Sequence, residues 1–481
     1  MSGSFRLYED QQHDFEILRE LTRKHSSILL QAATGYGKTV VAGSIAQSAR
    51  KKGRKILILL HRRELVRQTV DTLKRAGLGN DIGVVCNGFQ PAPWSPIQVA
   101  MVFSWVRRSP VFDPDMIFID EAHHVKAQSW HTAVEMHPNA RIVGMTATPI
   151  RLDGKGMDPP FDVMHCGLSI PELVERKRLA PMRVLRVPQG FGMKSIKKRK
   201  TEFSIKAMDE TITPKIVANS ANVYMKYLEG KRTIVFAVSK RHAMMVADAL
   251  VERGIRAAYV GDETPQGVRD ATFSKFGAGL IDVVCNVGLI DEGFDVPECE
   301  AVMDMAPTAS LSKFLQRAGR CTRYVAGKTA TFVDGVGNTY RHGLPDLARA
   351  WNLSSHQEGN GDPVKESDPT ELRWCRECLS LFDSKYESCP HCGKTHDGRP
   401  VREVDVELLE VIPEPPKPKP EPKMTAARRK ALISEAGSLH RMGQSEQAWK
   451  ILKETAKEAG YVKQWAHVIA NIINLPAKYR K

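Results

Sequence analysis

The string Ala32-Ala33-Thr34-Gly35-Tyr36-Gly37-Lys38-Thr39 constrains the fold more than any other part of the chain. Glycines in such a string let the backbone turn so that successive N–H groups face one anion, and a helix that starts directly afterwards adds its positive end. The apolar run at 27–31 and the stretch at 40–42 fit a buried strand and a helix. The string therefore predicts a phosphate-binding loop in an α/β domain, although Ala32 stands where the usual pattern has glycine.

Each polar group of that loop has an expected task. Lys38 is placed to reach the β- and γ-phosphates of a nucleotide, and the Thr39 hydroxyl to bind Mg²⁺. Residues 34–37 supply the backbone of the nucleotide site. Taken by itself, the string also fits a glycine-rich strand-to-helix turn that binds no nucleotide.

Two adjacent carboxylates follow a second apolar run. Residues 116–119 are typical of a parallel strand buried on both faces, and Asp120-Glu121-Ala122-His123 comes directly after them. Open α/β sheets bind their ligands at this carboxyl end of the strands. We therefore expect Asp120 to hold hydrated Mg²⁺ and Glu121 to orient and deprotonate an attacking water. An acidic turn with a hydrogen-bonded histidine is the alternative.

A third string, Gln316-Arg317-Ala318-Gly319-Arg320-Cys321-Thr322-Arg323, lies much farther along the chain. Around the first two strings, helices alternate with expected strands at 28–31, 56–60, 98–102, 116–119 and 141–145. Around the third string, helices alternate in the same way with expected strands at 233–237, 257–260, 282–286, 301–304 and 329–333. This alternation predicts two consecutive α/β lobes with parallel sheets. Guanidinium groups of the second lobe can then reach a nucleotide held by the first, in a site that opens and closes.

In this order the strings resemble the motifs of superfamily 2 helicases, in the DEAH-box branch that is similar to type III restriction subunits. The resemblance runs from about residue 5 to residue 353, and its last part is most similar to RadD-type bacterial and phage helicases. It implies two tandem RecA-like lobes. The further strings that carry it are Tyr8 with Gln11, His61 to Gln68, Thr146-Ala147-Thr148-Pro149, Val235-Phe236, Gly288 to Pro297, Phe332 to Asn338 and Arg341 to Pro345.

The resemblance implies roles in catalysis for the third string. Arg320 and Arg323 would be arginine fingers that stabilise charge on the transferred phosphoryl group, and Gln316 would position the water or the γ-phosphate. For Arg323 alone, a surface ion pair is the alternative.

It also implies roles in binding. Tyr8 and Gln11 would read the adenine, and Asp295 would contact the ribose or the opposite loop. In the related helicases, certain segments touch the phosphate backbone of a nucleic acid or couple it to ATP. The matching segments of this chain contain Arg62, Thr146, Thr148 and Gly288.

Four of the nine cysteines stand together as Cys375-x₂-Cys378-x₁₀-Cys389-x₂-Cys392. Two such pairs predict a tetrahedral Zn²⁺ site, and four thiolates leave no open coordination position, so the site would be structural. Free thiols or a redox pair are the alternative. Because the module follows the completed second lobe, we expect neither sheet to need it for folding. The remaining thiols fit reduced core cysteines: Cys86, Cys166, Cys285, Cys299 and Cys321.

Composition and pattern divide the chain into five expected parts. These are an ATP-binding lobe at 1–180, a second lobe at 181–353, a zinc-ribbon-like module at 370–396, a proline-rich linker at 411–423 and a small helical domain at 424–481. The stretch at 181–214 reads as a less regular crossing. Its run of basic residues at 197–200 fits either a solvated turn or a phosphate contact.

The charge of the chain favours a polyanionic partner. Lys and Arg exceed Asp and Glu by 15, and phosphate contacts by basic side chains dominate affinity for nucleic acids. No apolar run approaches the roughly 18 residues of a membrane span, and the acidic start of the chain argues against a leader peptide.

Together these observations predict an ATP-dependent DNA helicase or translocase in the cytoplasm of a bacterium or a phage-infected cell. It would use ATP, Mg²⁺ and a structural Zn²⁺ and act on single-stranded, forked or junction DNA in repair, recombination or phage replication. Two alternatives stay open. One is an RNA remodeller. The other is the motor subunit of a restriction or defence complex, with a separate nuclease bound through the zinc module or the C-terminal domain.

Overall fold

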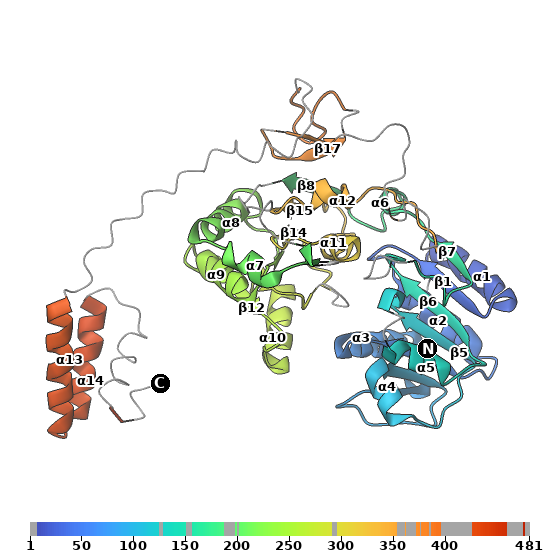
Figure 1. Cartoon of the computed structure of the whole chain (residues 1–481), viewed down its shortest axis with the longest axis horizontal. Helices are drawn as coiled ribbons and strands as arrows, with labels where there is room; N and C mark the ends of the chain where they lie inside the picture. Colours follow the sequence, from blue (N-terminus) through green and yellow to red (C-terminus); the bar gives the residue numbers. More distant parts are fainter. Residues whose placement is uncertain are drawn as a thin grey trace. The chain divides into compact units, whose positions relative to one another are not determined.

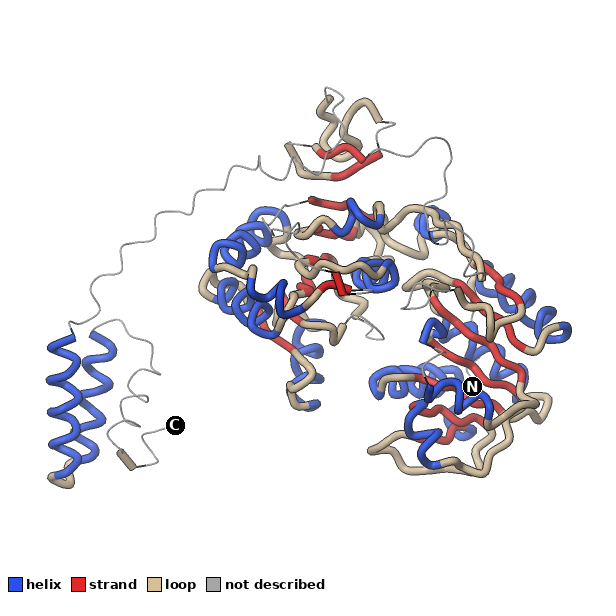
Figure 2. Tube along the Cα trace, in the orientation of Figure 1, coloured by secondary structure: helices blue, strands red, loops and turns tan. Residues whose placement is uncertain are grey.

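The computed structural model describes residues 7–124, 128–150, 156–186, 198–199, 202–290, 296–353, 361, 372–375, 377–383, 386–395, 426–458 and 475–476. The chain separates into two units, 1–409 and 410–481. Figures 1 and 2 show the two sheets of the first unit and the paired helices of the second. The expected division into two α/β lobes, a four-cysteine module and C-terminal helices is confirmed as a fold class.

The first lobe contains a seven-stranded sheet in which every pair of neighbours is parallel. Its order is β3 (Ile82–Val85), β4 (Ile97–Met101), β2 (Ile56–Leu60), β5 (Met116–Asp120), β6 (Arg141–Thr146), β1 (Ser27–Gln31) and β7 (Val163–Cys166).

Helices cover both faces of this sheet, because its strands are apolar on both sides. Leu29 packs into one core and its neighbours Ile28 and Leu30 into the other. One face is covered by α1 (Glu9–Lys24), α2 (Lys38–Arg50), α3 (Arg63–Leu73) and α6 (Ile170–Glu175), and the other by α4 (Val102–Arg108) and α5 (Gln128–Glu135).

The second lobe contains a six-stranded parallel sheet. Its order is β12 (Ala257–Val260), β13 (Val283–Asn286), β11 (Thr233–Phe236), β14 (Ala301–Asp304), β15 (Ala330–Asp334) and β8 (Met182–Arg186). Its helices are α7 (Ile205–Glu210), α8 (Pro214–Tyr227), α9 (Lys240–Val251), α10 (Gln266–Gly277), α11 (Leu311–Ala318) and α12 (Asn338–His342).

The crossing between the lobes is more regular than its sequence suggests. Its first residues form β8, which pairs with β15 along the whole strand, from Met182 opposite Ala330 to Arg186 opposite Asp334. Two short strands, β9 (Lys198–Arg199) and β10 (Glu202–Phe203), pair antiparallel, and β9 consists of two residues of the basic run. Residues 197 and 200 of that run lie outside the described residues.

Two small elements complete the described chain. In the four-cysteine module, β16 (Leu372–Trp374) pairs antiparallel with β17 (Leu381–Asp383). In the second unit, α13 (Ala426–Arg441) and α14 (Ser445–Glu458) share a core that includes Ala436, Ala448 and Leu452. The expected linker at 411–423 lies outside the described residues. Among the helices that the structure describes, none combines the length and apolar character that a membrane crossing requires.

Candidate functional site

The phosphate loop connects β1 to α2, as its glycine pattern predicts. Gly35 and Gly37 adopt left-handed φ angles of 92° and 96°, which residues with a Cβ rarely tolerate. Because α2 begins at Lys38, the N–H groups of the loop meet the positive end of a helix. Lys38 Nζ donates to the carbonyl oxygen of Ala32 at 3.0 Å, which holds the ammonium group against the loop.

Tyr36, between those glycines, fastens the loop to the rest of the first lobe. Its ring is buried, and its hydroxyl donates to Asp14 Oδ2 at 2.5 Å. The other oxygen of this carboxylate lies 2.8 Å from His165 Nε2 on β7. Burial and the Asp14 carboxylate raise the pKa of Tyr36 far above its usual value, so the phenol remains a donor.

The backbone of the loop is held as well. The Tyr36 carbonyl oxygen accepts from Gln11 Nε2 at 2.8 Å and from Arg178 Nη2 at 3.3 Å. Arg178 Nη1 also pairs with Asp10 Oδ1 at 3.0 Å. Sequence reasoning missed Asp10, Asp14, His165 and Arg178. The available signal was the tyrosine inside the glycine loop, because a buried phenol requires a hydrogen-bond partner.

The two carboxylates stand at the carboxyl edge of the first sheet. Asp120 ends β5 and is buried, and the N–H of Glu121 donates to Asp120 Oδ1 at 3.0 Å. Burial and the charge of Glu121 raise the pKa of Asp120 to about 6, against the opposing charge of Lys38. Glu121 has a φ of 49°, a left-handed conformation that a non-glycine residue adopts at a cost and that is common at functional sites.

A chain of polar contacts leads from Glu121 to the second lobe. His123 Nδ1 lies 3.4 Å from Glu121 Oε2 and 3.1 Å from Thr146 Oγ1. The Thr146 hydroxyl donates to the Thr148 carbonyl oxygen at 3.1 Å, and the Thr148 hydroxyl donates to Ser312 Oγ on α11 at 2.7 Å. The threonines of the expected coupling segment therefore lie between the carboxylates and the second lobe.

The third string of the sequence meets the phosphate loop. Arg323 Nη1 donates to the carbonyl oxygen of Gly35 at 2.7 Å. Gly319 lies so near the loop that an added Cβ would come within 2.7 Å of the Thr34 Cβ. Arg320 is half-buried in the 3-10 turn Gly319–Cys321, directly after α11.

The other polar residues of this string divide into two kinds. Arg317 forms a buried ion pair with Asp304, Nη1 to Oδ1 at 3.0 Å, and so holds α11 to its own sheet. Gln316 instead points across to the first lobe, where its Nε2 lies 3.4 Å from Glu121 Oε2. Among the described residues, the buried Oε1 of Gln316 has no hydrogen-bond partner.

These groups fit a nucleotide with its magnesium ion. The loop offers N–H groups and an ammonium for phosphates, and Asp120 with Thr39 offers oxygen ligands of the kind Mg²⁺ prefers. The unpartnered oxygen of Gln316 is a buried acceptor beside Glu121, where a water molecule can donate to it.

The residues expected to contact nucleic acid also bring the lobes together. Arg62 Nη1 donates to the carbonyl oxygen of Leu289 at 3.0 Å, directly after Gly288. Nearby, Glu64 of α3 pairs with Arg269 of α10 at 3.1 Å. Asp295 lies outside the described residues, so its expected ribose contact stays a prediction.

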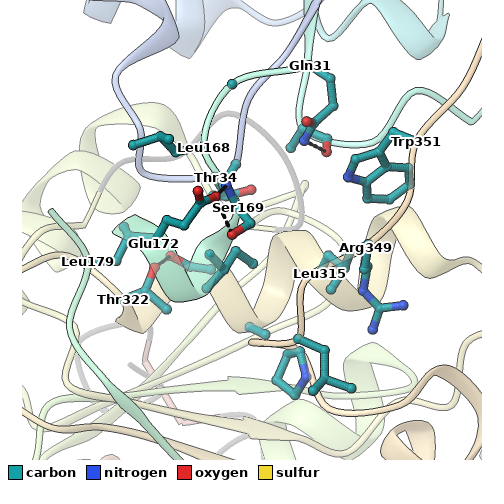
Figure 3. A pocket seen from close by; sticks show the side chains of 18 of the residues that line it. Gln31, Thr34, Leu168, Ser169, Glu172, Leu179, Leu315, Thr322, Arg349 and Trp351 are labelled. Carbon is teal, nitrogen blue, oxygen red and sulfur yellow. Dashed lines mark hydrogen bonds between the residues drawn. The ribbon is translucent and has the colours of Figure 1, made fainter. Parts of the chain in front are cut away.

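A cavity of about 270 Å³ lies beside the loop (Figure 3). Lys38 and Asp120 do not line it, so it adjoins the expected phosphate position and does not contain it. Its walls come from the loop, the residues around α6 and the second lobe: they include Gln31, Thr34, Glu172, Leu179, Thr322 and Trp351.

The four cysteines of the small module converge. All four sulfur atoms lie within 4.8 Å of one another, with Cys375 Sγ 3.5 Å from Cys392 Sγ and Cys378 Sγ 3.6 Å from Cys389 Sγ. A tetrahedral zinc ion with bonds of about 2.3 Å requires sulfur atoms about 3.8 Å apart. The cluster therefore fits a structural Zn²⁺.

The module is attached to the second sheet, a contact that the sequence did not predict. That neither sheet needs the module for folding stays a prediction. Leu185 of β8 forms an antiparallel bridge with Ser380, and Arg183 Nη2 donates to the Cys378 carbonyl oxygen at 2.9 Å. Leu379 and Leu381 are buried in the cores on the two faces of that sheet. Position along the chain did not indicate this attachment, because the sheet edge that the module covers belongs to β8, which lies 195 residues earlier in the chain.

Comparison with known proteins agrees with this geometry. Residues 4–151 match the family described as type III restriction enzyme, res subunit, and residues 216–325 match the helicase conserved C-terminal domain. A 51.5 kDa protein of a Lactococcus phage is 31% identical over 370 residues, which cover 77% of this chain and 78% of that protein. A putative ATP-dependent helicase of Saccharomyces cerevisiae is 27% identical over 314 residues, 60% of this chain but 45% of its own length.

The fold is shared with a solved structure as well. The ATP-dependent type ISP restriction-modification enzyme LlaBIII bound to DNA aligns with 69% of this chain and 28% of its own, with a TM-score of 0.52 and 18% identity. With both family matches in order on two parallel-sheet lobes, and with the phage relative similar over most of its length, this chain belongs to the superfamily 2 ATP-dependent helicases, in the branch of the type III restriction res subunit.

Proposed function

We propose that this helicase couples ATP hydrolysis to movement along DNA, or to remodelling of DNA. The observation that carries the proposal is that the two lobes meet at two places: Arg323 bonds Gly35 in the phosphate loop, and Gln316 approaches Glu121 after β5. Groups that touch across the nucleotide position make hydrolysis depend on how the lobes are arranged. In turn, hydrolysis can change that arrangement.

Within the site, each residue has a proposed task. The loop amides and Lys38 bind the phosphates, and Asp120 with Thr39 holds Mg²⁺, which supplies positive charge to the phosphate oxygens when bound. Glu121 removes a proton from the attacking water, which Gln316 orients through its buried oxygen.

Arg320 and Arg323 stabilise the charge that builds up on the transferred phosphoryl group. Such arginines raise turnover by about 10³-fold or more in related mechanisms. Because they belong to the second lobe, this contribution requires that the lobes have closed.

The link to the nucleic-acid track rests on two contacts between lobes. Thr148 bonds Ser312, and Arg62 bonds the backbone beside Gly288. When the lobes separate, both contacts break, and the segments expected to hold a phosphate backbone move apart. A strand held by one lobe at a time would then be advanced in steps.

DNA is the proposed track. Support comes from the match to a restriction-enzyme subunit, from the fold shared with an enzyme solved on DNA and from the net charge of +15. The test is the ATPase rate measured with single-stranded DNA, duplex, forked or junction DNA, and RNA of matched length. We expect stimulation by a DNA form that exceeds stimulation by RNA. Stimulation by RNA alone would make the protein an RNA remodeller.

Zinc and protein partners form the remaining part of the proposal. We infer that Cys375, Cys378, Cys389 and Cys392 hold one structural Zn²⁺, which their sulfur distances support. The nine cysteines, all of them among the described residues, form no disulfide, which fits the reducing cytoplasm that we propose for the protein. A nuclease recovered with the full chain, and cutting that depends on its ATPase, would favour the motor-subunit alternative.

A further inference from the structure

The turn after β15 belongs to a string that resembles helicases, yet it is not part of the nucleotide site. β15 ends at Asp334, whose buried carboxylate accepts five hydrogen bonds from the turn. Its Oδ1 accepts from the N–H groups of residues 336–338 at 2.7–3.1 Å, and its Oδ2 from the N–H and the hydroxyl of Thr339. Because a buried carboxylate that loses its donors destabilises the fold, the turn and the start of α12 are fixed.

The first residue of α12, Asn338, is fully buried. Its Nδ2 donates to Asp304 Oδ2 at 2.8 Å and to the carbonyl oxygen of Ala306 at 3.1 Å. Its Oδ1 accepts from the N–H of Thr308 at 3.0 Å and from Arg341 Nη1 at 3.2 Å. A side-chain amide has two N–H groups and two lone pairs, so all four are used. An aspartate of the same shape would keep the acceptors and lose both donors.

The contacts of Asn338 lead to α11 along two routes. Asp304 uses its other oxygen to pair with Arg317 of α11, at 3.0 Å. Thr308 accepts through its hydroxyl from the N–H of Ser310 at 3.0 Å, and Ser310 caps the first turn of α11. Asn338 therefore holds the end of β14, with which α11 is paired, and also the segment that leads into α11.

The last residue of α12 adds a contact along α11, which lies beside it (Figure 1). The ring of His342 stacks on Phe314 of α11, with 5.2 Å between the ring centres and 27° between the planes. Its Nε2 lies 3.0 Å from the carbonyl oxygen of Thr308, a pair in which the ring nitrogen must donate. Burial lowers the pKa of His342, so the ring is neutral at pH 7. α12 thus fixes α11 at its start and along its length.

α11 is the element that carries groups of the second lobe to the first. Its Ser312 accepts from the Thr148 hydroxyl, and its Gln316 approaches Glu121. Arg320 lies in the turn directly after it. A tilt of α11 would displace these groups together. Displacement of a catalytic group by about 1 Å can lower a rate by about 10²-fold.

We propose that Asn338 is a positioning residue for ATP hydrolysis. It fixes α11 in the orientation from which Gln316 and Arg320 act on the nucleotide, although its own contacts all lie within the second lobe. The inference rests on the tasks proposed above for Gln316 and Arg320. It does not require that DNA be the track.

The experiment measures ATP affinity, maximal turnover and thermal unfolding in the full chain. Asn338→Asp keeps the shape of the side chain but places a second carboxylate against Asp304. His342→Phe keeps a ring for Phe314 and removes the bond to Thr308. Tyr340→Ala is the matched control, because Tyr340 lies on the same short helix and is 53% exposed. Each variant is made in the wild type and in Arg320→Ala, together with Asn338→Ala.

In the wild-type background, both Asn338 variants should lower turnover by about 10- to 100-fold. ATP affinity should stay within about threefold, because the phosphate loop is fastened inside the first lobe. His342→Phe should lower turnover by about three- to tenfold, and Tyr340→Ala should change it by less than about twofold. A merely structural loss would lower affinity and turnover together, as the fraction of folded protein falls.

The Arg320→Ala background is decisive, because substitutions that act through one group are not additive. There the cost of Asn338→Ala should shrink at least about threefold, since the main group that α11 positions is gone. Equal cost in both backgrounds would overturn the proposal, as would wild-type turnover in both Asn338 variants or an equal loss of affinity and turnover. If neither Asn338 variant is folded at the assay temperature, His342→Phe in the two backgrounds decides by the same criterion.

Failure of this inference can be told from failure of the proposed function. If Arg320→Ala itself retains wild-type turnover, the proposed arginine finger is refuted, and this inference with it. If Arg320→Ala loses turnover and the cost of Asn338→Ala is the same in both backgrounds, only the positioning role of Asn338 is refuted.

Discussion

The two halves of the nucleotide site are built in different ways. In the first lobe, the loop is fastened by contacts made inside that lobe, from Tyr36 to Asp14 and from Gln11 to the Tyr36 carbonyl. In the second lobe, Gln316 and Arg323 make contacts that end on the first lobe. Groups fastened within one lobe can bind a nucleotide in any arrangement of the lobes. Groups that reach across act only when the lobes meet.

This difference separates binding from turnover. The first lobe already contains the phosphate loop, the proposed magnesium ligand Asp120 and the proposed base Glu121, each with partners of its own. The second lobe supplies charge and orientation, which matter most as the transition state forms. Substitutions of the groups that hold the phosphates and of the groups that act in the transition state should therefore change different measured quantities.

The largest effect is expected at Glu121, which lies in the first lobe but which we propose to act in turnover. Glu121→Gln should lower turnover by about 10³-fold or more, because the amide keeps the shape and loses the base. Affinity for ATP should stay within a few-fold of the wild type. Rapid-quench turnover and equilibrium nucleotide binding are the measurements. Hydrolysis at the wild-type rate in this variant would mean that another residue deprotonates the attacking water, and that Glu121 is not the base.

A second test uses the pKa of Asp120, raised to about 6 by burial and by Glu121. Mg²⁺ binds the ionised carboxylate, so apparent Mg²⁺ affinity in ATP turnover should fall about tenfold per pH unit below pH 6. The expectation is checked by Mg²⁺ titrations of ATP turnover between pH 5 and pH 8. Affinity that does not change across pH 6 would place the metal on another ligand.

The same group predicts a stability change of defined sign. A folded-state pKa above the unfolded value means that Asp120 favours the fold when protonated. This contribution is fully present below the ordinary pKa of 3.8 and is lost as pH rises from there through about 6. Asp120→Asn should therefore raise the midpoint of thermal unfolding by a few degrees at pH 8, by less at pH 5, and hardly at all below about pH 4. A lower midpoint at pH 8 would mean that the carboxylate charge is compensated in the fold.

The four-cysteine module allows the stability of the second lobe to be changed while the ATP-binding groups of the first lobe stay intact. Cys375→Ser with Cys378→Ser should remove about one zinc per chain and lower the unfolding midpoint of the second lobe, because Leu379 and Leu381 leave its cores. ATP affinity should change least, since the module's described contacts are with the second lobe. Metal analysis and calorimetry test this. A metal-free variant that unfolds like the wild type would show that the sheet does not depend on the module.

The sequence predicted the parts of the molecule that depend on local pattern. Apolar runs followed by glycines or carboxylates located β1 and β5 with their loops, because these strands are buried on both faces and their functional groups follow them directly. The four-cysteine spacing located a cluster for the same reason, since each pair of ligands is formed within one turn.

Long-range contacts were out of reach of the sequence. Arg178 stands 142 positions from Tyr36 and in no recognised motif, so only the folded lobe brings it to the phosphate loop. His165 meets Asp14 because β7 joins β1 at the edge of the sheet, a pairing that no local pattern specifies. The attachment of the zinc module to β8 was missed because β8 itself read as irregular chain.

The central claim, that the first lobe binds ATP and that hydrolysis also requires groups of the second lobe, is tested most directly by a pair of substitutions. ATP affinity and maximal turnover would be measured in the same preparations of Lys38→Ala and Arg320→Ala. Lys38→Ala should lose both. Arg320→Ala should keep affinity within about threefold while turnover falls by about 10²- to 10³-fold. An Arg320→Ala protein that loses affinity and turnover in equal measure, or that loses neither, would contradict the claim.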